Sequence, residues 1–261
     1  MSGLGQRRRT RFNANRLIPN AVTLLAVCAG MTAIRMALQD RWEIAVGAVV
    51  VAMILDAMDG RIARMMRATS DFGAHLDSLS DVINFGVAPA LIVYLWTTHD
   101  IRGLGWALSL VFAICCALRL ARFNTDLEKE NPPPWANTFF TGVPAPAGAG
   151  LVLLPMAMSF TFGDEVFRAA WLNAAVVLIV AGLMVSRIPT FSSKRLKIKR
   201  QHAWLVLLGF GILGAFLVST PWITLSVVGL LYAASIPFSV LAFRRVWRTP
   251  GPGSDNGNDQ A

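Results

Sequence analysis

Stretches of about 20 apolar residues recur along this chain, and one such stretch can cross the roughly 30 Å hydrocarbon core of a bilayer as a helix. Apolar residues make up 55% of the 261 and charged residues 15%, whereas an ordinary soluble domain has about 25% charged residues. We therefore expect an all-α polytopic membrane protein with about eight transmembrane helices. The expected spans cover residues 17–38, 42–59, 82–98, 104–121, 141–162, 169–189, 203–219 and 222–243.

No linker separates independent domains, so we expect one integral membrane domain over residues 17–243. Residues 1–16 form a basic N-terminus, which we interpret as retained because it lacks a convincing small-residue cleavage site. Residues 244–261 are interpreted as a disordered tail. The second helix is expected to continue past Asp59 into Arg64, and the third to begin near Gly73.

The distribution of Lys and Arg predicts the orientation, because cytoplasmic flanks carry an excess of these residues. With the N-terminus inside, 20 of the 24 Lys and Arg fall in cytoplasmic segments. The opposite side holds only Arg35, Arg41, Arg102 and Arg168. We therefore expect both termini in the cytoplasm, in a plasma (inner) membrane protein.

The net charge of +9 does not indicate a nucleic-acid-binding protein. The basic residues are spread over five membrane-flanking segments, and no recognised nucleic-acid motif accompanies them. Cationic flanks suit anionic membrane lipids and phosphate-bearing substrates. We expect those partners and no nucleic acid.

Four acids stand in or beside the second and third spans, where an Asp at the centre of a membrane helix costs roughly 2.5 to 3.5 kcal/mol. Ionisable residues in such places are functional candidates by default. Residues three, four and seven apart share one face of a helix, so the two halves of the motif form two facing stripes. The motif reads Asp56-x-x-Asp59-Gly60-x-x-Ala63-Arg64, then Gly73-x-x-x-Asp77-x-x-x-Asp81.

Four carboxylates in one cavity would repel one another unless a cation compensates their charge. An oxygen-only ligand set, without Cys or paired His, favours Mg²⁺ or Mn²⁺, and ligand type alone also allows Ca²⁺. The candidate metal ligands are Asp56, Asp59, Asp77 and Asp81. By the charge distribution this site faces the cytoplasm, where Arg64 and Arg67 can pair with phosphates.

At every fixed position of this motif the chain resembles the CDP-alcohol phosphotransferase family. The resemblance implies that family's fold and a reaction in which an alcohol attacks the lipid-side phosphorus of a CDP-linked lipid and releases CMP. It implies that Asp56, Asp59 and Asp77 hold the metal, while Asp81 takes the proton from the attacking hydroxyl. It also implies a cytidine pocket, lined by Gly60, Ala63 and Gly73, with Asn20 and Thr23 of a Pro-Asn-x-x-Thr element facing the nucleotide.

Two further segments resemble the phosphatidylserine synthase subfamily, which implies CDP-diacylglycerol and L-serine as substrates. The segment from Asp77 to Ala90 matches D-S-L-A-D-x-V-S-F-G-V-A-P-A, except that Ser80 replaces Ala and Asn84 replaces Ser. The other segment holds R-L-A-R-F-N, beginning at Arg119, and F-x-G-x-P-x-P, beginning at Phe140. A serine carboxylate needs cations, so we expect it to bind Arg119 and Arg122, with Asn124 as a polar neighbour; topology signals are the alternative role of these arginines.

Other acceptors remain open, because the family motif itself does not select the alcohol. Glycerol 3-phosphate and an inositol phosphate are the alternatives within the family. A divalent metal transporter is the alternative from another class, although its acids should line a path across the membrane. The resemblance suggests a homodimer, although the small-residue face near Gly148 and Gly150 could equally pack within one chain.

Overall fold

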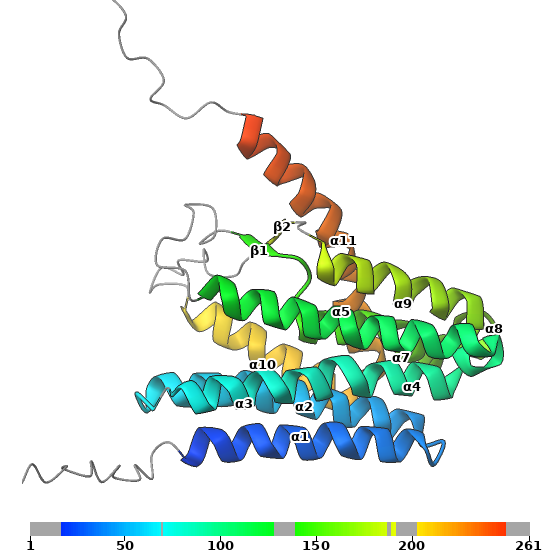
Figure 1. Ribbon diagram of the computed structural model, residues 1–261, viewed down its shortest axis with the longest axis horizontal. Coiled ribbons are helices and arrows are strands. Elements are labelled where there is room, and N and C mark those ends of the chain that lie inside the picture. Colours follow the sequence, from blue (N-terminus) through cyan, green and yellow to red (C-terminus); the bar gives the residue numbers. More distant parts are fainter. Residues whose placement is uncertain (1–16, 69, 128–138, 187–188, 192–202, 249–261) are drawn as a thin grey trace, which may run out of the picture.

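The computed structural model describes residues 17–68, 70–127, 139–186, 189–191 and 203–248. Most of its helices lie side by side along the long axis of the molecule (Figure 1). The expected all-α class is confirmed for these residues, with one exception. Two three-residue strands, β1 (Phe139–Thr141) and β2 (Pro189–Phe191), pair antiparallel, with Phe140 opposite Thr190. The sequence prediction missed this pairing because it joins two short connecting segments that are far apart in the chain.

The helices follow the expected order of apolar segments. The second helix extends to Met65 and the third begins at Asp71, close to the expected Arg64 and Gly73. The helices are α1 (Leu17–Ala37), α2 (Trp42–Met65), α3 (Asp71–Asp81), the π-helix η2 (Val82–Val87), α4 (Ala88–Trp96), the 3₁₀-helix η3 (Thr98–Ile101), α5 (Gly103–Leu127), α6 (Ala145–Val152), α7 (Leu154–Phe162), α8 (Asp164–Phe167), α9 (Ala170–Val185), α10 (Ala203–Ser219) and α11 (Pro221–Arg248).

Two expected boundaries were wrong. Helix α5 continues to Leu127, beyond the expected end of its span at residue 121, and α11 continues to Arg248, into the expected tail. The span expected over 141–162 agrees with the membrane-length segment Ala145–Phe162, which consists of two helices that meet at Leu153. Pro155 lies in the first turn of α7, where its missing N–H and ring interrupt a continuous helix. The remainder of the expected tail and the basic N-terminus lie outside the described residues.

Five helical segments in the described part of the chain are long and apolar enough to cross a membrane. They are Leu17–Ala37, Asp71–Trp96, Gly103–Thr125, Ala145–Phe162 and Pro221–Ser239. The apolar helix α9 is shorter, α10 has 17 residues, and α2 carries Glu43 as well as two motif acids. The expected count of eight spans and the orientation of the termini therefore stay predictions.

Small residues bring α1 close to its neighbours. Its buried face carries Thr23, Ala26, Gly30, Ala33 and Ala37, spaced three or four residues apart. This face packs on α2 and also on α3, η2 and α4. A side chain added at Gly30 would collide with Oδ1 of Asn84 in η2. Small faces of this kind allow membrane helices to approach closely, which brings the two acidic helices together beside α1.

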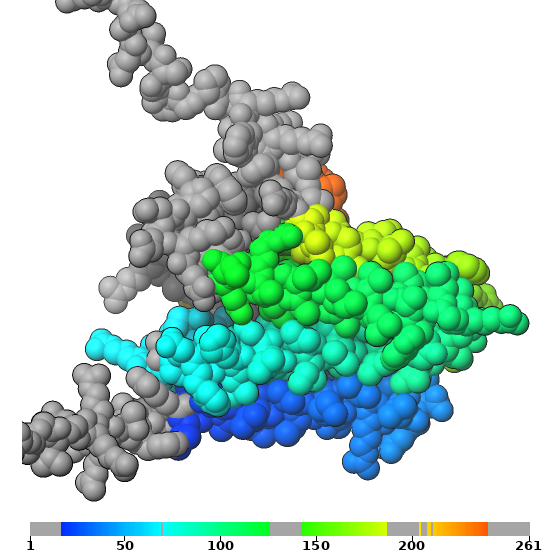
Figure 2. Space-filling view, in the orientation of Figure 1, coloured from blue at the N-terminus to red at the C-terminus, as the bar shows by residue number. Residues whose placement is uncertain are grey.

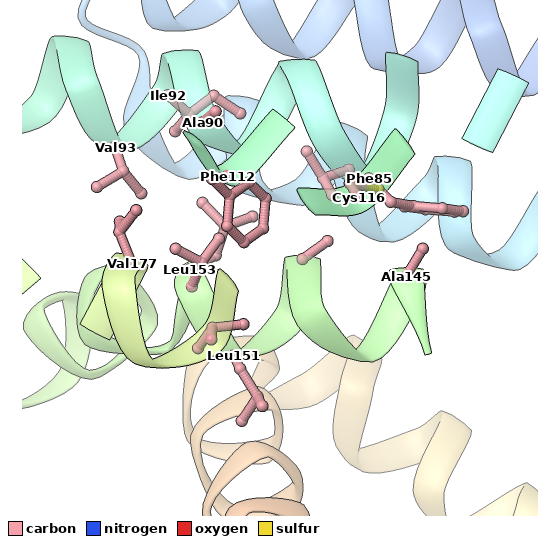
Figure 3. Packing of buried hydrophobic residues seen from close by; sticks show 14 of the residues in the cluster. Phe85, Ala90, Ile92, Val93, Phe112, Cys116, Ala145, Leu151, Leu153 and Val177 are labelled. Atoms are coloured by element: carbon pink, nitrogen blue, oxygen red, sulfur yellow. The ribbon is translucent and has the colours of Figure 1, made fainter. Parts of the chain in front are cut away.

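The apolar core lies between α4, α5, α6–α7 and α9. Phe112 of α5 is fully buried and lies among Val93, Leu153 and Val177, which come from the surrounding elements (Figure 3). On the face drawn in Figure 2, α1, α3–α4, α5 and α9 form successive layers. The pairs α1 with α4, α4 with α5 and α5 with α9 pack directly.

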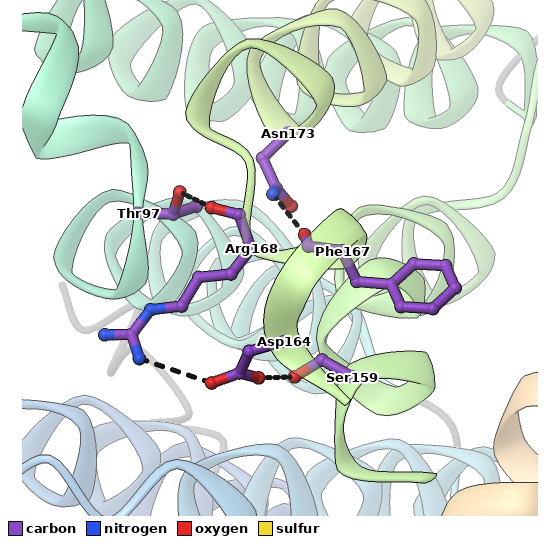
Figure 4. Close-up of polar contacts among 6 residues, drawn as sticks. All are labelled: Thr97, Ser159, Asp164, Phe167, Arg168 and Asn173. Atoms are coloured by element: carbon purple, nitrogen blue, oxygen red, sulfur yellow. Dashed lines mark hydrogen bonds and ion pairs between the residues drawn. The ribbon is translucent and has the colours of Figure 1, made fainter. Parts of the chain in front are cut away.

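Polar contacts hold the turn between α7 and α9, at the end of the bundle away from the motif acids (Figure 4). Thr97 donates to the carbonyl of Arg168 at 2.7 Å, and Asn173 donates to the carbonyl of Phe167 at 2.8 Å. Ser159 donates to Asp164. Asp77 and Thr97 are roughly 30 Å apart along a helix that rises about 1.5 Å per residue, so this network is structural.

Candidate metal centre

Helix α3 starts at a capped end, and this places its two acids. Ser70 precedes the helix in an extended conformation, and its Oγ accepts a hydrogen bond from the backbone N–H of Gly73 at 3.1 Å. A serine in this position satisfies one of the free donors of the first turn. From this start, Asp77 and Asp81 lie one turn apart on the same face.

Three of the four motif acids converge. Asp56 and Asp59 of α2 and Asp77 of α3 each offer a carboxylate oxygen, and these oxygens lie within 4.8 Å of one another. Asp59 is only 4% exposed. Because three carboxylates this close repel one another unless a cation compensates their charge, a hard divalent cation fits these oxygen ligands. The site could hold a divalent metal ion.

Asp81 stands next to this trio and is not part of it. Its carboxyl group lies within hydrogen-bond reach of that of Asp56. Its Oδ1 is buried and has no hydrogen-bond partner among the described residues. A carboxylate in this position is beside the metal ligands and still has an unused acceptor.

Thr23 contacts the acidic group directly. Its hydroxyl lies 2.6 Å from Oδ2 of Asp59 and 3.1 Å from the carbonyl oxygen of Pro19. Thr23 is 5% exposed, so this is a buried contact between α1 and α2. The nucleotide-facing role that the resemblance implies for Thr23 stays a prediction, and in the structure its hydroxyl donates to a candidate metal ligand.

The small residues and arginines of the motif lie around the same helix ends. A methyl group added at Gly73 would come 3.1 Å from Oδ1 of Asn20, so α1 and α3 approach closely there. A methyl group at Gly60 would lie 3.5 Å from Nη1 of Arg64. Arg67 follows α2 in a left-handed conformation with φ of 49°, which ends the helix. Ala63 lies on α2 between the acids and this end.

The three acceptor-site candidates on α5 have different environments. Arg122 donates from Nη1 to the carbonyl of Val185 at 2.8 Å, and Asn124 donates from Nδ2 to Oγ of Ser78 at 2.9 Å. Arg119 has a buried Nε with no hydrogen-bond partner among the described residues. It interacts electrostatically with Asp81. Of the three side chains, Arg119 is therefore the one with a buried donor atom that lacks a partner among the described residues.

The sequence reasoning missed a hydrogen-bonded pair beside Asp81. Nδ2 of Asn84 donates to Oγ of Ser80 at 3.0 Å, and both residues are at most 1% exposed. These are the two positions at which the chain departs from the subfamily pattern, so that departure was the available signal. The pair lies where α3 becomes the π-helix η2, and π-helical turns are frequent at functional sites.

Comparison with known proteins agrees with this geometry. The sequence model of the family described as CDP-alcohol phosphatidyltransferase matches residues 16–186, which is more than half of the chain. The chain belongs to the CDP-alcohol phosphatidyltransferase family. A second model, CDP-alcohol phosphatidyltransferase 2, matches residues 204–237. The last two helices, for which the sequence had offered only hydropathy, thus also resemble a phosphatidyltransferase of this type.

Several relatives carry the same name, CDP-diacylglycerol–serine O-phosphatidyltransferase. The protein from Mycobacterium leprae is 36% identical over 235 residues, covering 90% of this chain and 78% of its own. That from Mycobacterium tuberculosis H37Rv is 35% identical over 247 residues, covering 95% and 86%. That from Helicobacter pylori 26695 is 37% identical over 181 residues, covering 69% and 74%. The chain is therefore an integral membrane enzyme. Its long apolar helices indicate the membrane, and its family indicates the enzyme.

Proposed function

We propose that this enzyme transfers the phosphatidyl group of CDP-diacylglycerol to L-serine, giving phosphatidylserine and CMP. The observation that carries the proposal is the convergence of Asp56, Asp59 and Asp77 within 4.8 Å. Serine as the acceptor is supported by the names of relatives that match 90% or more of the chain. We further propose that the enzyme lies in the plasma (inner) membrane with its site facing the cytoplasm, since 20 of 24 cationic residues fall on that side of the expected topology.

In this proposal Asp56, Asp59 and Asp77 would hold Mg²⁺ or Mn²⁺. A divalent ion bound by them would supply positive charge against the negative charge of the pyrophosphate and of the leaving CMP. Thr23 keeps Asp59 oriented through its 2.6 Å hydrogen bond, and residues that orient metal ligands in this way strongly affect metal affinity. The proposal includes a homodimer, which is supported by the family resemblance alone.

Asp81 acts as the general base. It accepts the proton of the serine hydroxyl while the hydroxyl oxygen forms a bond to the lipid-side phosphorus. The bond between that phosphorus and the oxygen of CMP breaks, and CMP leaves with the electron pair. The buried Oδ1 of Asp81 without a partner supports this role, because a base needs a free acceptor close to the reacting atoms.

The cytidine and the phosphates occupy the end of α2 and the start of α3. Gly60, Ala63 and Gly73 leave room for a ligand close to the backbone, with Asn20 beside Gly73 as a hydrogen-bonding group. Arg64 and Arg67 pair with phosphate oxygens. Thr23 reaches the nucleotide only indirectly in this arrangement, through Asp59.

The acceptor lies between Asp81 and α5. Arg119 binds the serine carboxylate, because it is a cation whose buried Nε has no hydrogen-bond partner among the described residues. Arg122 and Asn124 do not bind the acceptor directly in this proposal. They hold α5 in place through their hydrogen bonds to Val185 and Ser78.

The decisive experiment is a turnover assay of the purified full-length protein with CDP-diacylglycerol and Mn²⁺ or Mg²⁺. L-serine, glycerol 3-phosphate and an inositol phosphate compete as acceptors, and we expect serine to be the preferred one. Good turnover with another acceptor and none with serine would reject the serine assignment and keep the family. Asp81→Asn should lower kcat by about 10²-fold to 10⁴-fold at saturating metal; near-normal turnover would remove Asp81 as the base.

A further inference from the structure

Helix α11 carries a buried hydroxyl group that has no hydrogen-bond partner among the described residues. Tyr232 lies on the face of α11 that also carries Leu225, Val228 and Gly229, and this face lines an apolar cavity of about 310 Å³. The other walls of the cavity come from α2 and from α6–α7. Tyr232 is the one polar side chain among its described lining residues.

The hydroxyl of Tyr232 is buried and has no hydrogen-bond partner among the described residues. Buried tyrosine hydroxyls usually find a partner, because leaving them unpaired costs free energy. Nε of Arg119 is also buried and has no hydrogen-bond partner among the described residues, and the two side chains interact electrostatically. Two buried polar groups that lack partners and interact in this way indicate a shared anionic or carbonyl ligand.

The position of these donors relative to the acids follows from α2. Met53 lines the cavity, and Asp56 lies one helical turn further along the same face. Asp56 in turn lies beside Asp81, which interacts with Arg119. The part of the cavity that Met53 lines is therefore about one helical turn from Asp56, the acid beside the proposed base.

We propose that the hydroxyl of Tyr232 and the guanidinium of Arg119 together bind the carboxylate of the amino-acid acceptor and direct its hydroxyl towards Asp81. This inference rests on the proposed function. The charges match, because one guanidinium and one neutral hydroxyl compensate a single negative charge. A phosphate monoester carries a charge of about −1.5 to −2 at neutral pH and would need a second cation. Tyr232 thus contributes to the choice of serine over phosphorylated alcohols.

The test compares Tyr232→Phe with the wild-type enzyme in the full-length protein. The change removes the hydroxyl and keeps the ring that lines the cavity. A hydrogen bond to a charged group corresponds to an effect of about tenfold or more, so we expect KM for L-serine to rise by about tenfold. KM for CDP-diacylglycerol and the metal concentration for half-maximal activity should stay unchanged.

The chain offers one matched control, since it contains only two tyrosines. The ring of Tyr94 packs edge-on against Trp106, with centroids 5.4 Å apart, in the part of α4 that leads away from the acids. Tyr94→Phe should leave every kinetic constant unchanged. A second readout uses L-serinamide, which keeps the hydroxyl and lacks the carboxylate. The preference of the enzyme for serine over serinamide should fall about tenfold in Tyr232→Phe and stay constant in Tyr94→Phe.

The outcomes separate this inference from the function on which it rests. Absence of serine turnover in the wild-type enzyme would refute the proposed function. Serine turnover in the wild type with an unchanged KM for serine in Tyr232→Phe would refute the role of Tyr232 alone. A rise in KM for CDP-diacylglycerol instead would assign the hydroxyl to the lipid substrate and overturn the proposal.

Discussion

The hydrogen bond from Thr23 to Asp59 offers a sharp test of how α1 supports the acidic site. Thr23→Val keeps the shape of the side chain and removes its hydroxyl. The bond is 2.6 Å long, it is buried, and its acceptor is a carboxylate. Hydrogen bonds to charged groups contribute about 1.5 to 3 kcal/mol, which corresponds to about tenfold to a hundredfold in an equilibrium constant.

This estimate agrees with the general effect of residues that orient metal ligands, whose loss costs about 10-fold to 100-fold in metal affinity or activity. We therefore expect the Mn²⁺ or Mg²⁺ concentration for half-maximal activity to rise by at least about tenfold in Thr23→Val. The measurement is a metal titration of the transferase activity at saturating CDP-diacylglycerol and serine. Thr23→Ser, which keeps a hydroxyl, should recover most of the affinity.

Thr32 is the matched control on the same helix. Its hydroxyl donates to the carbonyl of Cys28, one turn earlier, at 2.7 Å, but it is exposed and has no bond to an acid among the described residues. Thr32→Val should leave the metal titration unchanged. If Thr23→Val and Thr32→Val gave the same titration curve, Thr23 would have no role in orienting Asp59, and the reasoning from this bond would be refuted.

Four further substitutions, with one control, test the packing of the site and of the core. Gly30→Ala should lower both the activity and the thermal stability in detergent, because the added methyl group overlaps Asn84. Gly47→Ala is the control and should affect neither, because a methyl group there meets nothing within 4 Å. Asn84→Ser and Ser80→Ala should each destabilise the protein by about 1 kcal/mol. A double-mutant cycle should give a coupling free energy of about 0.5 to 1.5 kcal/mol between the two positions. If the two destabilisations were strictly additive, the hydrogen bond between these side chains would be contradicted. Phe112→Ala should destabilise by about 3 to 5 kcal/mol in thermal unfolding, and an unchanged melting temperature would show that this part of the core is not tightly packed.

Much of the fold and of the site follows from local sequence. Apolar stretches predict helices by their length, and the helical period alone puts Asp56 with Asp59 and Asp77 with Asp81 on single faces. The joint spacing of these residues was also sufficient to identify the family, which the comparisons confirmed. These features depend only on neighbours within one helix, so they can be read without knowing how the helices pack.

Contacts between helices were decided by the tertiary structure. The sequence did not indicate that Thr23 would donate to Asp59, or that the hydroxyl of Tyr232 would be buried without a partner among the described residues. Each depends on the rotation and separation of packed helices, which small faces such as that of α1 set through close contact. Helix periodicity orients a side chain relative to its own axis, whereas its partner on another helix is selected only when the whole bundle packs.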